Sequence, residues 1–156
     1  MIAIDIPDFG PLELHHLVLD YNGTLAVDGE MVDGVRERLE ALASKVKVHV
    51  VTADTFGKVK SAMEGIPAEV RVLPPGRQDH AKLEFIEGLD VEGVVCIGNG
   101  RNDRLMLEHA ALGIAVVLGE GAATASINAA DIVAHSITDA LDVLSNPLRL
   151  VATLRS

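Results

Sequence analysis

The sequence predicts an α/β fold, with a parallel sheet of five to six strands and helices on both faces. Two observations support this prediction. Apolar runs bounded by turn residues alternate along the chain with segments of helical periodicity, which is typical of strand–helix–strand units. The 156 residues, of which 49% are hydrophobic, are also enough to bury the core of one domain over 1–156 without disulfides or metal.

Residues 1–14 predict an N-terminal β-hairpin added to this domain. Apolar residues alternate before and after the turn residues 7–10, which is typical of two strands joined by a short connection. The alternating positions are Ile2, Ile4, Ile6, Leu12 and Leu14.

Six apolar runs flanked by turn residues predict the strands of the sheet. Asp20 ends the first run, and Asn99 and Asp103 follow the fourth. Because ligands of open α/β sheets bind beyond the carboxyl ends of the strands, these side chains are expected to meet at one place. The strands are expected at His15–Asp20, Lys47–Thr52, Glu69–Leu73, Val94–Gly98, Ile114–Leu118 and Asp131–Ala134.

Six helices are expected between these strands or after the last of them. Met31–Ser44 has clear helical periodicity, with Val35 and Leu39 on its apolar face. Asn102 is the expected N-cap of the helix after the fourth strand. The other helices are expected at Phe56–Glu64, His80–Gly88, Asn102–Leu112, Gly121–Ala129 and Ser136–Leu144.

Four segments, in this order, resemble the motifs of the haloacid dehalogenase-like (HAD) phosphohydrolases, and most closely those of their soluble P-type-ATPase-like branch. The resemblance covers most of the chain and implies a Rossmann-like HAD domain that hydrolyses a phosphorylated substrate. The segments are Asp20-Tyr21-Asn22-Gly23-Thr24, Val50-Val51-Thr52-Ala53-Asp54, His80-Ala81-Lys82-Leu83 and Gly98-Asn99-Gly100-Arg101-Asn102-Asp103.

The resemblance also implies a role for individual residues. Asp20 would be the nucleophile that forms an aspartyl-phosphate, and Asn22 would occupy the acid/base position. The expected contacts to substrate come from Gly23, Thr24, Thr52, Ala53, Lys82 and Asn102. Mg²⁺, which prefers oxygen ligands, would be bound by the carboxylate of Asp20, the backbone carbonyl of Asn22, and Asn99 and Asp103 of the fourth motif.

At two positions the chain departs from the phosphatases of this family. Asn22 replaces the aspartic acid that serves as general acid and base, and an amide cannot carry a proton at neutral pH. Loss of such a group typically costs about 10²–10⁴ in rate, so slow or narrow activity is expected. Asn99 replaces a metal-binding aspartate, which predicts weaker Mg²⁺ binding.

These departures leave alternatives to an efficient phosphatase. The chain could be a phosphoacceptor that is phosphorylated on Asp20 and discharged slowly, or a Mg²⁺- and phosphate-binding regulatory module with the same fold. A dinucleotide site at Gly98-x-Gly100 is disfavoured, because the third glycine of that fingerprint is absent.

Spacing and composition limit the remaining possibilities. The 27 residues between Thr24 and Thr52 and the 29 between Thr52 and Lys82 leave no room for a cap domain, so the site is open unless a homo-oligomer covers it. The net charge of −10 argues against nucleic-acid binding. No segment has the roughly 20 apolar residues of a membrane span, and Cys96 is the lone cysteine, so a cytoplasmic protein is expected.

Overall fold

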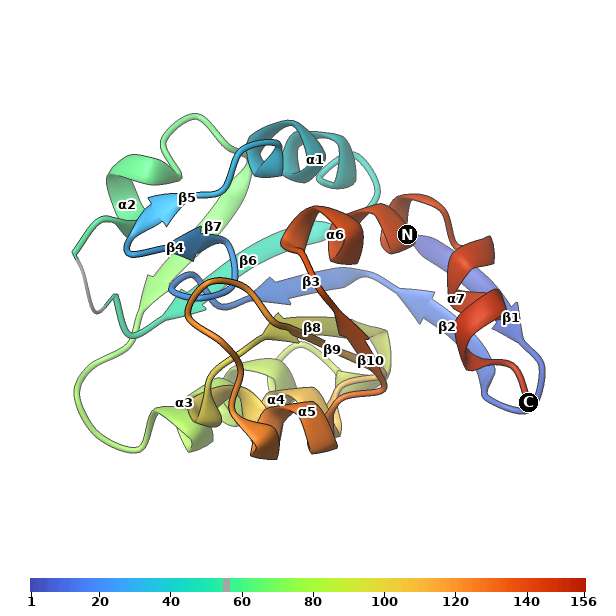
Figure 1. The fold of residues 1–156 in the computed structure, drawn as a ribbon. Coiled ribbons are helices and arrows are strands. Elements are labelled where there is room, and N and C mark those ends of the chain that lie inside the picture. The colour runs from blue at the N-terminus through green and yellow to red at the C-terminus, as the bar shows by residue number, and fades with distance from the viewer. Residues whose placement is uncertain (55–56) are drawn as a thin grey trace.

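A parallel sheet of six strands forms the centre of the protein in this computed structural model, which describes residues 1–54 and 57–156 (Figure 1). The strand order is β10-β9-β8-β3-β6-β7, and every neighbouring pair is parallel. The predicted fold class is therefore confirmed. The strands are β3 (His16–Leu19), β6 (Lys47–Thr52), β7 (Ala68–Val72), β8 (Val94–Gly98), β9 (Leu112–Val116) and β10 (Ile132–Ala134).

Helices cover both faces of the sheet, with α1 and α6 on one side and α3, α4 and α5 on the other (Figure 1). The alternation of side chains along β3 creates the two cores: Leu17 packs toward α1 and α6, whereas Val18 packs toward α3 and α4. The helices are α1 (Val35–Leu42), α2 (Val59–Ala62), α3 (Gln78–Glu87), α4 (Arg104–His109), α5 (Thr124–Ala129), α6 (Ile137–Ser145) and α7 (Leu148–Leu154), with 3-10 turns at Val91–Gly93 and Arg101–Asp103.

The predicted N-terminal hairpin is confirmed. β1 (Ile2–Ile6) pairs antiparallel with β2 (Gly10–Leu14), and the apolar side of the pair extends the core beneath α1 and α6. α7, which the sequence analysis did not predict, packs against β1 through the buried Leu150 (Figure 1).

The predicted helix Met31–Ser44 is wrong in its first turn. Asp28 and Gly29 have φ values of 52° and 81°, so they form a tight turn between β4 (Ala26–Val27) and β5 (Glu30–Met31). An Asp-Gly pair at positive φ is a strong hairpin signal, and here it outweighs the helical periodicity of the following residues. The helix begins only at Val35, after Gly34 at φ 85°.

Other element boundaries also differ from the prediction. The strand expected at Ile114–Leu118 lies two residues earlier, at Leu112–Val116, because a continuous apolar run does not define its own ends. The helix expected over Asn102–Leu112 is shorter, and Asp103 rather than Asn102 precedes it. Of the helix expected at Phe56–Glu64, Phe56 lies outside the described residues and α2 covers Val59–Ala62.

Short connections keep the carboxyl edge of the sheet accessible. Between β3 and β6 the chain forms β4, β5 and α1, and in the described residues between β6 and α3 it forms α2 and β7, so no cap domain is present there. None of the described helices has the length and apolar character required to cross a membrane.

At Gly113 the backbone of β9 lies close against α4. A Cβ atom at this position would lie 2.3 Å from the carbonyl oxygen of Leu107, a backbone atom that cannot rotate away. Gly113→Ala is therefore expected to lower the free energy of unfolding by about 1–3 kcal/mol, the usual cost of overpacking. Urea denaturation measures this loss. Gly88→Ala is the matched control, since its Cβ would be 3.4 Å from the nearest atom, and an equal loss in both variants would contradict the prediction.

Candidate active site

The candidate site lies where the order of the sheet reverses. β3 is followed by α1 on one face of the sheet and its neighbour β8 by α4 on the other, so these two connections diverge and open a crevice at the carboxyl ends of the strands. A cavity of about 210 Å³ lies at this edge. Its lining residues come from the ends of several strands and the loops that follow them: Asp20, Asn22, Thr52, Ala53, Asn99, Gly100, Asn102 and Glu120.

Lys82 links two carboxylates beneath this cavity. Its Nζ lies 3.0 Å from Oδ1 of Asp20 and 2.6 Å from Oδ1 of Asp103, and it donates a longer bond of 3.4 Å to Oδ1 of Asn102. Lys82 and Asp103 are 0% exposed and Asp20 is 6% exposed. A buried cation therefore joins the third motif to the first and the fourth.

Burial and charge shift the pKa of both partners. Burial raises the pKa of Asp20 to about 6, the negative charge of Asp103 adds to this rise, and Lys82 opposes it. Burial alone would lower the pKa of Lys82, but the charges of Asp103 and Asp20 raise it above its ordinary value. Lys82 is therefore a permanent cation in this site, and Asp20 is ionised at neutral pH.

Asp103 organises the loop after β8. Its Oδ2 accepts hydrogen bonds from the backbone N–H groups of Asn99 (3.0 Å) and Gly100 (2.8 Å), while its Oδ1 faces Lys82. Gly98 makes this arrangement possible, because a Cβ there would lie 2.5 Å from Cγ of Asp103. Both oxygens of Asp103 are thus engaged within the protein.

The loop after Asp20 turns sharply. Gly23 has φ 78°, and its N–H donates to the carbonyl of Ala26 over 2.7 Å. A Cβ on Gly23 would come 2.2 Å from Nδ2 of Asn99, so the turn packs directly on the fourth motif. Thr24 is fully buried, and its hydroxyl donates to Oδ1 of Asn99 over 3.2 Å.

Asn22 has a buried polar side chain that the described part of the protein leaves unsatisfied. Its side-chain oxygen and nitrogen are both buried, and neither has a hydrogen-bond partner among the described residues. A buried polar group without a partner costs about 1–3 kcal/mol. Since Asn22 lines the cavity, a water molecule or a ligand there could supply the missing partner.

Thr52 closes β6 with its side chain at the cavity. It is 1% exposed, and its Oγ1 accepts a hydrogen bond of 3.1 Å from the N–H of Asp54. Because this bond uses a lone pair, the hydroxyl hydrogen remains available to an oxygen in the cavity.

Sequence comparison relates the chain to proteins of an archaeon. No family model matches it. Uncharacterized protein MJ0073 of Methanocaldococcus jannaschii is 46% identical in an alignment 84 residues long, which covers 51% of this chain and 90% of that protein. Uncharacterized protein MJ0072 of the same organism is 44% identical over 39 residues, 25% of this chain and 89% of that protein. The chain belongs to the MJ0073 family.

Solved structures match nearly the whole chain. The 3-deoxy-D-manno-octulosonate 8-phosphate phosphatase of Yersinia pestis has a TM-score of 0.68 at 16% identity and covers 96% of this chain and 95% of its own. The Moraxella catarrhalis phosphatase of that name, in complex with magnesium, phosphate and KDO, has a TM-score of 0.67 at 14% identity, covering 91% and 94%. A Streptomyces avermitilis protein assigned to the HAD family of hydrolases has a TM-score of 0.68 at 19% identity, covering 86% and 84%. The chain has the HAD fold.

Within this HAD fold, the residues expected from the sequence occupy two layers. Asp20, Asn22, Thr52, Ala53, Asn99 and Asn102 line the cavity. The others lie behind it. Gly23 and Thr24 shape the loop, Lys82 bonds to the Asp20 carboxylate, and Asp103 bonds to Lys82 and to the loop backbone. The structure therefore brings all four motifs together at one edge of the sheet.

Glu120 is a lining residue that sequence reasoning missed. It lies in the loop between β9 and α5, outside the four motifs, and its Oε2 accepts a hydrogen bond of 3.1 Å from the N–H of Asp28 in the β4–β5 turn. This contact spans 92 residues of sequence, so no local signal could have placed Glu120 at the cavity.

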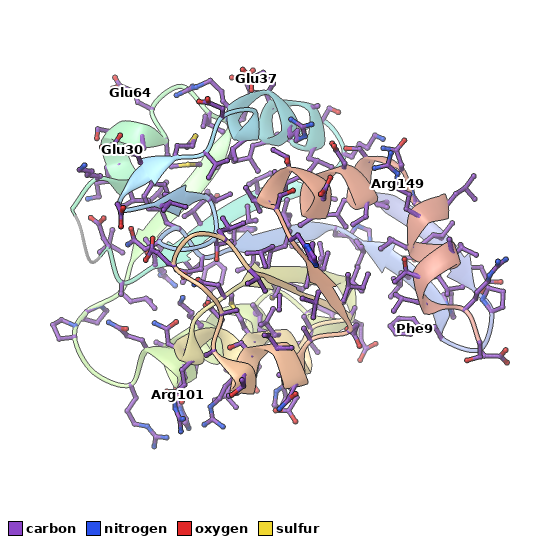
Figure 2. The ribbon with its side chains drawn as sticks, viewed as in Figure 1. Phe9, Glu30, Glu37, Glu64, Arg101 and Arg149 are labelled. Carbon is purple, nitrogen blue, oxygen red and sulfur yellow. The ribbon has the colours of Figure 1, made fainter. Side chains whose placement is uncertain are left out.

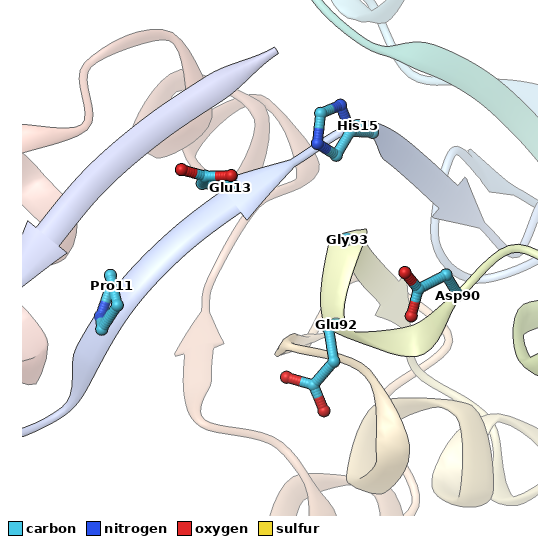
Figure 3. Close-up of a pocket in the computed structure, with 6 residues that line it drawn as sticks. All are labelled: Pro11, Glu13, His15, Asp90, Glu92 and Gly93. Atoms are coloured by element: carbon cyan, nitrogen blue, oxygen red, sulfur yellow. The ribbon is translucent and has the colours of Figure 1, made fainter.

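A second hollow, of about 310 Å³, lies at the opposite end of the sheet (Figure 3). Three carboxylates, Glu13, Asp90 and Glu92, surround it together with His15, before the start of β3 and β8. This ring of negative charge repels an anionic ligand, and none of the four motifs reaches it. The cavity at Asp20 is therefore the better candidate for phosphate chemistry.

Proposed function

We propose that this protein is a Mg²⁺-dependent phosphohydrolase that forms a phosphoaspartate on Asp20. One observation carries the proposal: the buried Asp20–Lys82–Asp103 cluster ends in a carboxylate that faces a cavity at the switch point of the sheet. A carboxylate nucleophile needs such a position, beside a cation that offsets the charge of the phosphoryl group. Phosphatases with the same fold support the assignment.

In the proposed reaction, an oxygen of Asp20 attacks phosphorus in line with the leaving group. The bond between phosphorus and the leaving-group oxygen breaks, and the leaving group departs with the electron pair. Water then attacks the phosphorus of the acyl phosphate, which releases inorganic phosphate and restores Asp20. Lys82 holds Asp20 in position, and the free hydroxyl hydrogen of Thr52 donates to a phosphoryl oxygen.

The cavity also fits Mg²⁺. Asp20 offers a carboxylate, Asn22 its backbone carbonyl and Asn99 an amide oxygen, and the unpartnered side chain of Asn22 belongs to the lining of the same cavity. Mg²⁺ selects such oxygen donors and retains several waters. When bound, the ion would neutralise charge on the phosphoryl group. Asp103 would act on this site mainly through Lys82 and the loop amides, to which both its oxygens are bonded.

Asn22 limits the rate of the proposed reaction. Its amide cannot protonate a leaving group. P-type ATPases also lack an acid at this position, which agrees with a place for the chain in the soluble P-type-ATPase-like branch. The same observation favours a second candidate, a phosphoacceptor in which the phosphoaspartate is long-lived. Turnover of an aryl phosphate with Mg²⁺ distinguishes the two, because a phosphoacceptor releases at most one equivalent of product.

Asn22→Asp is expected to raise the turnover of alkyl phosphates more than that of aryl phosphates. The substitution adds a proton carrier at almost constant volume, and an alkoxide leaving group needs a proton that an aryl oxide does not. The gain for alkyl esters should approach the lower end of general-acid catalysis, about 10²-fold. Measurement of kcat/KM across leaving groups of increasing basicity tests this. Equal changes for both ester classes would show that residue 22 does not face the leaving group.

A further inference from the structure

A second cavity, of about 270 Å³, adjoins the catalytic one. We call it the arginine cavity, since Arg77 and Arg101 both line it; its lining residues are Gly76, Arg77, Gln78, Asp79, Arg101 and Asn102. Asn102 also lines the cavity at Asp20, so the two hollows share a wall. The arginine cavity is built from the loop before α3, the first two residues of α3 and the 3-10 turn before α4.

Hydrogen bonds hold this shared wall in place. Nδ2 of Asn102 donates to Oε1 of Gln78 over 3.2 Å, and Oδ1 of Asn102 accepts from Nζ of Lys82 over 3.4 Å. The same side chain therefore connects the lysine beneath the catalytic cavity with a residue that lines the arginine cavity. A ligand that occupied both cavities would have to pass Asn102 to bring its second group to Arg77 and Arg101.

The charge at this cavity is opposite to that of the whole protein. The net charge is −10, yet Arg77 and Arg101 are exposed and form no ion pair within the described part of the chain. The nearby Arg104, in contrast, lies 3.4 Å from Asp79. The structure thus places two uncompensated guanidinium groups beside the catalytic cavity of an acidic protein. Planar guanidinium groups match carboxylate and phosphate oxygens.

We propose that the arginine cavity binds a second anionic group on the leaving group of the substrate. The substrate class is then a phosphate monoester whose leaving group carries a carboxylate or a second phosphate. This inference rests on the proposed phosphohydrolase function. The binding of a doubly anionic ligand, however, can be measured without turnover.

The test compares ligands that differ only at the end remote from the phosphate. 6-Phosphogluconate carries a carboxylate there, glucitol 6-phosphate a hydroxyl, and glucitol 1,6-bisphosphate a second phosphate. 3-Phosphoglycerate and glycerol 3-phosphate form a shorter pair that tests reach. Calorimetric titration with Mg²⁺ into the Asp20→Asn protein gives the affinities in the absence of hydrolysis.

The expected result is that at least one doubly anionic ligand binds about 10-fold or more tightly than its hydroxyl counterpart, which corresponds to about 1.4 kcal/mol. Adding Arg77→Ala and Arg101→Ala should bring this ratio close to one. Adding Arg149→Ala instead should preserve it, because Arg149 lies on the α7 side of the molecule, well separated from Arg101 (Figure 2).

Three outcomes would overturn the proposal: ratios below about 2 for every pair, a ratio that survives the double arginine substitution, or no binding of any ligand. Failure of the catalytic proposal has a different signature. In that case the doubly anionic ligands still bind more tightly than their hydroxyl counterparts, and the preference still depends on Arg77 and Arg101. The protein with Asp20 intact, however, hydrolyses neither these esters nor p-nitrophenyl phosphate.

Discussion

Asp20→Asn is expected to lower the Mg²⁺-dependent turnover of p-nitrophenyl phosphate by at least about 10⁴-fold, the scale of effect seen when a covalent nucleophile is removed. Asparagine has nearly the same volume as aspartate and can still accept a hydrogen bond from Lys82, so the fold should persist. The neutral amide, however, is too weak a nucleophile to attack phosphorus. Steady-state kinetics measures the loss. Asp5→Asn, an exposed carboxylate in β1, serves as the control with unchanged activity.

Asp20→Asn is also expected to change how the free energy of unfolding depends on pH. Because burial raises the pKa of Asp20 from about 3.8 to about 6, this group stabilises the protein fully below pH 4, and that contribution is lost as the pH rises through 6. In metal-free buffer, the free energy of unfolding of the wild type minus that of the variant should therefore fall by up to about 3 kcal/mol over this range. A difference that stays flat, or rises with pH, would show that Asp20 is not held in a buried, charge-destabilising site.

Lys82→Met is expected to lower the free energy of unfolding by about 3–5 kcal/mol at pH 7, the usual cost of removing one partner of a buried ion pair. Methionine fills a similar volume, but it leaves Asp20 and Asp103 buried without their cation. Urea denaturation followed by circular dichroism measures the change. Binding of vanadate should weaken in parallel, because the site also loses its positive charge.

Two further variants sharpen this test. Lys47→Met removes a lysine of similar length from an exposed pair with Glu69, with side chains 57% and 63% exposed, and should cost less than about 1 kcal/mol. Combining Lys82→Met with Asp103→Asn should recover part of the lost stability, since one uncompensated charge disappears. A loss for Lys82→Met no larger than that for Lys47→Met would mean that Lys82 is not a buried cation.

The sheet and the edge at which the motifs meet could be predicted from the sequence. Each predicted strand overlaps an observed one, because runs such as Val94–Gly98 are buried on both faces and are bounded by turn residues. The arrival of Asp20 and Asn99 at the same edge follows from the parallel direction of β3 and β8. The missed hairpin at Asp28-Gly29 did have a local signal, which the periodicity of the next residues obscured.

The rest of the site depends on contacts between distant parts of the chain. A lysine on a helix is ordinarily solvated, and nothing in the sequence around Lys82 shows that it is fully buried between two carboxylates. Because of that burial, substitution of Lys82 is expected to lower stability as well as phosphate binding. Glu120, and the convergence of Arg77 with Arg101, likewise depend on how separate loops pack.

The backbone amides after Asn22 and Asn99 have a consequence for the chemical ageing of the protein. Asparagine followed by glycine deamidates when the next backbone nitrogen attacks the side-chain carbonyl. Here the N–H of Gly23 donates to Ala26, and that of Gly100 donates to Asp103. While these bonds are intact, neither nitrogen is free to close the succinimide ring. Conversion of either residue to aspartate therefore requires local opening of its loop. The fraction of protein molecules that carry aspartate at residue 22 or 99 should then increase with the time that the loop spends open.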